Sequence, residues 1–131
     1  MKKLLLLLFL VTGVGFAAEV PRLAPADAAK LVADGSAVLI DVREPAEWAA
    51  TGVVAGAVLL PKSDFDGTQK QWKEFLEKTG DKELILYCRT GHRAGLVAAA
   101  LAEKGHRVAN AGGLKDWQEA GQPVVAPKGA P

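Results

Sequence analysis

Short apolar runs alternate along this chain with amphipathic segments, a pattern typical of strands separated by helices. The apolar runs predict strands at Ala37–Asp41, Ala57–Leu60, Leu84–Tyr87 and Arg107–Asn110. Helical spacing is found at residues 26–33, 45–51, 68–78, 94–102 and 114–120. Strands that alternate with helices usually pair in parallel. We therefore expect one α/β domain whose central, mostly parallel sheet is covered by helices on both faces.

Proline and glycine residues mark several of the expected helix ends. Pro25 and Pro45 suit the first turn of a helix, where a missing N–H does no harm. Gly35 and Gly105 stand where helices should stop, because glycine accepts the left-handed conformation that often ends them. The segment from Leu96 to Ala102 is apolar almost all round, which predicts a heavily buried helix.

The first residues have a different pattern from the rest. Two lysines open the chain, an unbroken apolar run extends from Leu4 to Val11, and Gly15-Phe16-Ala17 has small residues at a cleavage spacing. The apolar run is too short to span a membrane. We expect residues 1–17 to be a secretory signal peptide, with cleavage after Ala17 or, alternatively, after Ala18. An uncleaved membrane anchor is the other interpretation.

Residues 18–131 would then form a single exported domain, in the periplasm if the source is a Gram-negative bacterium. The full chain has 16 basic and 15 acidic residues, and removal of Lys2 and Lys3 leaves 14 basic against 15 acidic. A nearly neutral protein has no strong field to attract a polyanion. We therefore expect neither nucleic acid nor, after signal cleavage, a membrane as its partner.

The only cysteine of the chain, Cys88, follows the clearest predicted strand. A lone thiol forms no internal disulfide, so its presence in an exported protein needs another reason. The polar turn Arg89-Thr90-Gly91-His92-Arg93 separates it from the next predicted helix, which should begin near Ala94. Backbone N–H groups in such a turn, the helix N-terminus and nearby arginines all stabilise a thiolate. The pattern predicts an activated cysteine, and a buried inert cysteine is the alternative.

Three stretches of the chain resemble the rhodanese-type sulfurtransferases. The segment from Cys88 to Arg93 is similar to their active-site loop, Ile40–Trp48 to their first signature, and Gly112–Trp117 to the turn after their last core strand. The resemblance covers about residues 23–125. It implies a single rhodanese-like domain whose cysteine takes sulfur from thiosulfate or a related donor and passes it, as a persulfide, to a thiophilic acceptor.

The resemblance also implies roles for individual residues. The expected catalytic residue is Cys88, and the expected substrate-binding residues are Arg89, Thr90, Gly91, His92 and Arg93. Arg89 would attract the anionic donor, and His92 would add charge when protonated. For both, an ordinary surface residue is the alternative. Arg93 either binds the anion or pairs with an acid such as Glu47.

Asp41, Arg43 and Glu47 are expected to support the loop from the end of the first strand. Arg43 and Glu47 stand four residues apart, so a simple ion pair between them is an alternative. The chain departs from the family in one place. It has Val53-Val54 after Thr51-Gly52, where the family usually has a histidine and an isoleucine, and we interpret that position as structural.

The remaining motifs give no reason to expect a bound cofactor. One cysteine and two histidines do not make a metal ligand set, and no glycine-rich nucleotide motif precedes a helix. We expect no metal and no cofactor, because the sulfur would be carried covalently on Cys88. The expected partners are a small anionic sulfur donor and an acceptor, which would be a thiol, cyanide or a protein.

Two other functions fit parts of the pattern. Cysteine-dependent phosphatases and arsenate reductases also place a cysteine and an arginine around a backbone loop, but that loop is one residue longer than the four residues between Cys88 and Arg93. The smaller ring suits a single sulfur atom better than a tetrahedral oxyanion, which favours sulfur transfer. A non-catalytic sulfur carrier or partner-binding module would keep the same loop and is the second alternative.

Overall fold

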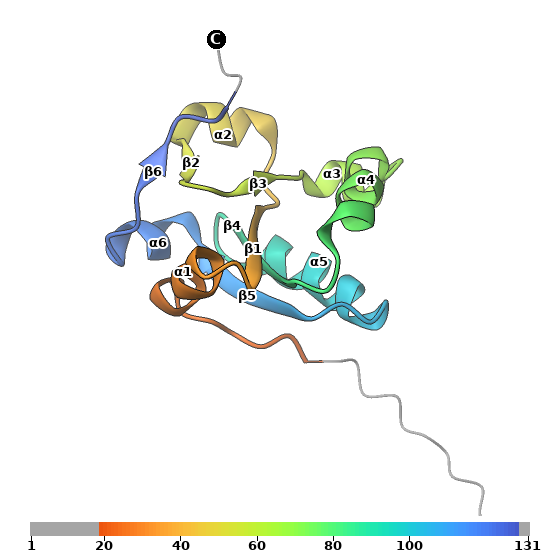
Figure 1. Ribbon diagram of the computed structural model, residues 1–131. Helices are drawn as coiled ribbons and strands as arrows, with labels where there is room; N and C mark the ends of the chain where they lie inside the picture. The colour runs from red at the N-terminus through yellow and green to blue at the C-terminus, as the bar shows by residue number, and fades with distance from the viewer. Residues whose placement is uncertain (1–18, 129–131) are drawn as a thin grey trace, which may run out of the picture.

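The computed structural model describes residues 19–128, so the expected signal peptide lies outside the described residues. Its centre is a parallel sheet of four strands in the order β3-β1-β4-β5 (Figure 1). These strands are β1 (Ala37–Asp41), β3 (Val58–Leu59), β4 (Glu83–Cys88) and β5 (Val108–Gly113). A separate antiparallel pair joins β2 (Val53–Val54) to β6 (Val124–Val125).

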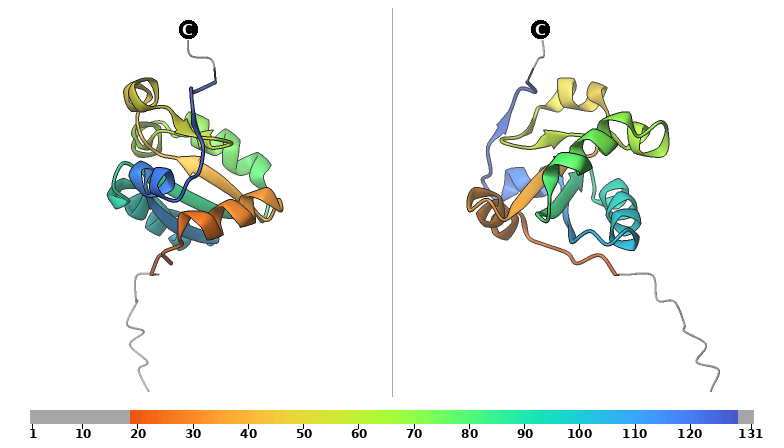
Figure 2. Two further views of the ribbon diagram at one scale, coloured as in Figure 1. Left: turned by 90° about the vertical axis from the view of Figure 1, so that its left-hand side faces the viewer. Right: turned by 45° about the vertical axis from the view of Figure 1, so that its right-hand side comes forward.

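Helices cover both faces of the sheet, as expected for a parallel sheet whose strands are buried on both sides. The helices are α1 (Pro25–Ala33), α2 (Pro45–Thr51), α3 (Lys62–Asp66), α4 (Lys70–Thr79), α5 (His92–Glu103) and α6 (Leu114–Glu119). The two core clusters place α3, α4 and α5 against one face and α1 and α6 against the other (Figures 1 and 2). The α/β fold class predicted from the pattern is confirmed.

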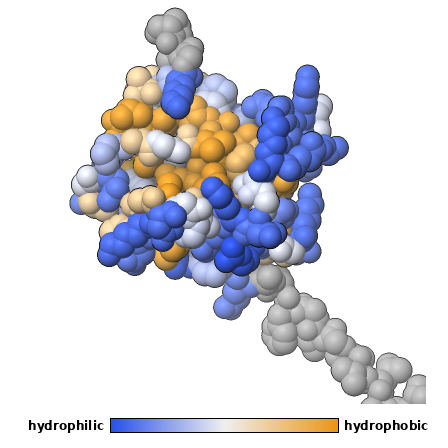
Figure 3. Space-filling model, viewed as in Figure 1, coloured by the Kyte–Doolittle hydropathy of each residue, from blue (hydrophilic) through white to orange (hydrophobic). Residues whose placement is uncertain are grey.

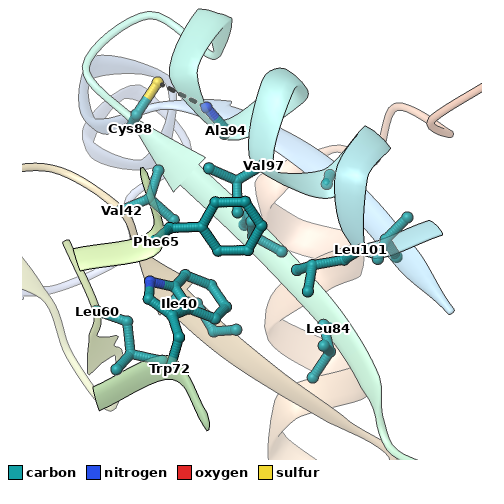
Figure 4. Close-up of a cluster of buried hydrophobic side chains, with 13 residues drawn as sticks. Ile40, Val42, Leu60, Phe65, Trp72, Leu84, Cys88, Ala94, Val97 and Leu101 are labelled. Carbon is teal, nitrogen blue, oxygen red and sulfur yellow. Dashed lines mark hydrogen bonds between the residues drawn. The ribbon is translucent and has the colours of Figure 1, made fainter. Parts of the chain in front are cut away.

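Alternate residues of each central strand pack into two separate hydrophobic cores. On β4, Leu84 and Leu86 pack with Trp72 of α4 and with the apolar side of α5 (Figure 4). The residue between them, Ile85, faces the opposite core, which also contains Trp117 of α6. This two-residue alternation follows from strand geometry, because successive side chains point to opposite faces.

Several predicted boundaries differ from the observed ones. Helix α5 begins at His92 rather than near Ala94, and β5 continues to Gly113, so the glycines expected in a turn end the strand. The predicted burial of the helix from Leu96 onward is wrong at its first residue, since Leu96 is 51% exposed. Helix α3 was not predicted, because its five residues, Lys62–Asp66, include a single large apolar side chain, that of Phe65.

Parallel pairing brings the carboxyl ends of the strands to one edge of the sheet. Asp41 pairs with Tyr87 across β1 and β4. The register of β4 and β5 shifts after Leu86, so that Cys88 lies opposite Gly113. This irregularity sets the cysteine against the very end of β5, where a ligand site is expected in an open α/β sheet.

Within residues 19–128, no helix combines the length and apolar character needed to cross a bilayer. Figure 3 does show apolar residues gathered on the face that carries β2 and β3. A cavity of about 390 Å³ lies there, lined mainly by residues of β2, β3 and β6. Its lining includes no residue of the loop after β4.

Candidate active site

Cys88 is held by backbone N–H groups at the junction of β4 and α5. Its Sγ accepts hydrogen bonds from the N–H of Gly91 at 3.0 Å and from the N–H of Ala94 at 3.5 Å. Figure 4 draws the bond from Ala94. The side chain has no exposed surface and belongs to the core cluster that contains Val97. Burial fits the alternative of an inert cysteine, but two converging N–H donors are what a thiolate or a persulfide anion needs.

The loop curls around the sulfur because of its backbone conformation. Gly91 has a φ of 98°, in the left-handed region that residues with a Cβ rarely adopt. That conformation turns its N–H toward Cys88 and starts α5 at His92. The His92 N–H donates to Thr90 Oγ1 at 3.3 Å, which closes the turn. The twelve residues of α5 direct their positive dipole end at the same centre.

Asn110 of β5 fixes the loop from the other side, a role that the sequence did not reveal. Its Nδ2 donates to the Gly91 carbonyl at 2.9 Å, and its Oδ1 accepts from the Gly112 N–H at 3.0 Å. Its own backbone bonds to Pro21 and Leu23, which lie alongside β5. The side chain is 5% exposed. The signal available in the sequence was an asparagine at the end of a predicted strand, two residues before Gly112-Gly113.

Arg93 is paired with Glu47 in a two-pronged ion pair. Its two terminal nitrogens lie 2.6 and 2.8 Å from the two carboxylate oxygens of Glu47. This contact lowers the pKa of Glu47 to about 2 and raises the pKa of Arg93. Of the two roles expected for Arg93, the structure shows the pairing with an acid. The pair ties the first turn of α5 to α2.

The ion pair between Arg43 and Glu47, which the sequence offered as an alternative, is not formed. Arg43 instead bonds to the buried Asp41, with its terminal nitrogen 2.7 Å from Oδ2. It also donates to Thr51 Oγ1 and to the Gly52 carbonyl, both at 2.8 Å. Arg43 lies in the turn between β1 and α2, before the helix begins. The rule that side chains four residues apart meet on a helix therefore does not apply to Arg43 and Glu47. The pair of Asp41 and Arg43 therefore clamps the entry and exit of α2.

The remaining loop side chains face solvent. Arg89, Thr90 and His92 are exposed, and Arg89 and Thr90 form one wall of a cleft of about 590 Å³. Opposite them lie residues of α2 and α6. Across residues 19–128, no cluster of three or more potential metal-ligating His, Cys, Asp or Glu side chains occurs.

The fold and the site together define a parallel α/β domain with one cysteine in a backbone cradle at the carboxyl edge of its sheet. The chain belongs to the rhodanese-like domain family, whose profile matches residues 24–120. This confirms the resemblance seen in the three sequence stretches. It also makes the chain a member of the rhodanese-like sulfurtransferases, proteins that act on a sulfur donor and an acceptor.

Individual relatives agree with this assignment. The chain is 34% identical over 94 residues to a sulfurtransferase of Allochromatium vinosum, covering 70% of this chain and 81% of that one. It is 30% identical over 92 residues to a thiosulfate:glutathione sulfurtransferase of Saccharomyces cerevisiae, covering 64% and 66%. The solution structure of the polysulfide-sulfur transferase homodimer of Wolinella succinogenes superposes with a TM-score of 0.66 at 29% identity, covering 86% and 83%.

The pair of Arg93 and Glu47 predicts a pH-dependent contribution to stability. The pKa of Glu47 falls from 4.5 to about 2 in the folded protein, so the contribution is full above the higher value and is lost toward the lower one. At neutral pH, Glu47→Gln should lower the free energy of unfolding by about 1 kcal/mol. The difference from wild type should vanish as the pH approaches 2, as measured by urea unfolding.

The matched control is Glu74→Gln, which removes an exposed ion pair to Lys78 on α4. Water screens this pair, so its removal should change the free energy of unfolding by only a few tenths of a kcal/mol at any pH. An equal, pH-independent loss in the two variants would show that the pair of Arg93 and Glu47 does not hold the loop.

Proposed function

We propose that this protein takes a sulfane sulfur from thiosulfate or a related donor, keeps it as a persulfide on Cys88 and passes it to a thiophilic acceptor. One observation carries the proposal: the Sγ of the only cysteine accepts two backbone N–H groups at a helix N-terminus. These donors favour an anionic sulfur before the transfer and an anionic persulfide after it. The relative named as a thiosulfate:glutathione sulfurtransferase supports thiosulfate as the donor.

The proposed cycle needs no oxidant and no cofactor. The Cys88 thiolate attacks the outer sulfur of thiosulfate, a sulfur–sulfur bond forms to Sγ, and the bond within thiosulfate breaks with its electron pair leaving on sulfite. The acceptor then attacks the outer sulfur of the persulfide, and Cys88 leaves as thiolate. With cyanide as acceptor the product is thiocyanate. Because Cys88 is fully buried, the loop must open to admit the donor.

Arg89 is the residue that we assign to donor binding. It follows Cys88 directly, is exposed and stands at the cleft. Within residues 19–128 it forms no ion pair with an acid, whereas Arg93 is bound to Glu47 and Arg43 to Asp41. Its guanidinium is therefore available to a small anion. Thr90 and His92 flank the same opening, and Gly91 supplies one of the N–H groups.

The arrangement of Arg93 speaks against the phosphatase alternative. A phosphatase needs the arginine that closes its loop to bind the oxyanion, but here Glu47 engages the guanidinium through both carboxylate oxygens. A sulfur carrier that delivers to a protein partner would use the same Cys88 persulfide. Turnover with free thiosulfate and cyanide separates an enzyme from such a carrier.

We also propose that the protein is exported, on the basis of the lysine start and the apolar run of residues 4–11. The mature chain should begin at Ala18 or Glu19 and appear in the periplasm of a Gram-negative host. N-terminal sequencing of the protein from envelope and cytoplasmic fractions checks this. A soluble cytoplasmic protein with Met1 intact would contradict it.

Replacement of Cys88 tests the central chemistry. Wild-type protein treated with thiosulfate should gain the mass of one sulfur atom, and cyanide should remove it as thiocyanate. Cys88→Ser should abolish both steps, because the chain has no other thiol, while circular dichroism confirms that the fold is kept. Full turnover in Cys88→Ser would rule out the persulfide mechanism. Comparable release of phosphate from an aryl phosphate by the wild type would favour a phosphatase instead.

Replacement of Arg89 separates donor binding from activation of the thiol. Arg89→Ala should lower kcat/KM for thiosulfate by about ten- to a hundredfold, since a charge-assisted contact contributes about 1.5–3 kcal/mol. Alkylation of Cys88 by neutral iodoacetamide should change much less, because the backbone N–H groups stay in place. The control is Arg107→Ala, at the far end of β5, which should alter neither rate. Equal losses of both rates in Arg89→Ala would show that Arg89 shapes the loop instead.

A further inference from the structure

The first described residues form a short strap along the edge of the sheet. Residues 20–23, red-orange in Figure 1, run beside β5, the outermost strand on that side. The Asn110 N–H donates to the Pro21 carbonyl at 2.9 Å, and the Leu23 N–H donates to the Asn110 carbonyl at 3.1 Å. Arg22 stands between these two bonds, opposite Asn110 in an isolated parallel bridge. The backbone of Arg22 is therefore fixed against the strand that ends at the cysteine loop.

The side chain of Arg22 extends from this strap to the cysteine loop. Its Nη1 lies 3.2 Å from the position that a Cβ would take on Gly91. Gly91 is the residue whose N–H donates to Cys88 Sγ at 3.0 Å. The guanidinium of Arg22 therefore rests on the same residue that holds the sulfur. A cavity of about 260 Å³ opens beside it, away from the cleft that Arg89 lines.

No acid compensates the charge of Arg22 directly. Within residues 19–128 this arginine, which is exposed, forms no ion pair. Asp116 lines the same cavity, but it lies beyond ion-pair distance and accepts the Gly113 N–H at 2.8 Å. The positive charge of Arg22 can therefore act on other anions that approach the loop.

The arginines around the cysteine loop divide into paired and unpaired ones. The two that bind Asp41 and Glu47 contribute little net charge, because each is neutralised by its partner. Across the described chain, Arg22 and Arg89 lack such a partner. They line two cavities that share no residue, so the two cations reach the loop from different sides.

We propose that Arg22 is a second residue that sets the specificity for an anionic donor, together with Arg89. The inference rests on the proposed function and goes beyond it by assigning a residue from the start of the domain. Thiosulfate carries two negative charges and must approach a sulfur that is itself anionic, so the two repel each other. A fixed cation beside the loop counters this repulsion, and its attraction grows with the charge of the donor.

Two donors that differ by one charge test this role on the purified full chain. Methanethiosulfonate has the shape of thiosulfate, with a methyl group in place of one charged oxygen, and carries a single negative charge. In both reactions the Cys88 thiolate attacks the outer sulfur and forms the same persulfide. The bond between the two donor sulfurs breaks, and its electron pair leaves on sulfite or methanesulfinate. Mass spectrometry follows persulfide formation, and neutral iodoacetamide is the uncharged probe.

Arg22→Gln should lower the rate with thiosulfate about three- to fivefold and the rate with methanethiosulfonate about twofold, as expected for an exposed charge. Alkylation by iodoacetamide should change least. Arg22→Lys should restore most of the thiosulfate rate, because it returns the charge. The differences should disappear in about 1 M salt, where the Debye length falls to about 3 Å. The control is Arg107→Gln, which removes an exposed arginine before β5 begins and should alter none of the three rates.

The results distinguish a failure of Arg22 from a failure of the proposed function. If wild-type protein gains no sulfur from either donor, the proposed function fails and the role of Arg22 fails with it. If the persulfide forms but Arg22→Gln lowers all three rates by one factor, or Arg22→Lys restores nothing, Arg22 only supports the shape of the loop. Unchanged rates in Arg22→Gln would overturn the proposal as well. Arg22 is exposed and lies outside both core clusters, so its variants should fold.

Discussion

Parallel pairing of β1, β4 and β5 is the constraint on which the site depends. It places the ends of three strands along one edge, with Asp41, Cys88 and Gly113 in adjacent register positions. A Cβ on Gly113 would lie 2.2 Å from the Arg89 carbonyl. Only a glycine lets the end of β5 approach the loop so closely, and that approach brings Asn110 within reach of the Gly91 carbonyl.

The supporting contacts form two groups around this edge. Asp41 and Arg43 hold both ends of α2, and the phenol of Tyr87 lies among them, its pKa raised by burial and by Asp41. The Tyr87 hydroxyl accepts the Val54 N–H at 2.9 Å, which links β4 to β2. Asn110 holds the loop from the other side. The loop is therefore kept in place from two directions while its outer side chains stay exposed.

Local patterns predicted the four strands of the parallel sheet, most of the helices and the cysteine loop, because those features depend on residues near one another in sequence. Contacts between distant residues were less accessible. Nothing local matches Val53 to Val125 in the β2–β6 pair. The pair of Arg93 and Glu47, 46 positions apart, was predicted only as one of two possible roles of Arg93. The four-residue helical spacing also suggested the wrong partner for Arg43, because a sharp turn after β1 directs its side chain to Asp41.

The complete enclosure of Cys88 has a consequence for how this thiol survives among oxidants. A mixed disulfide requires a second sulfur, with its carbon chain, to reach an atom that water does not reach. In the proposed persulfide the reactive sulfur would lie one bond, about 2 Å, beyond Sγ. While the loop is closed it shields the thiol, and an oxidant can reach the sulfur only during an opening of the kind that the proposed donor also needs.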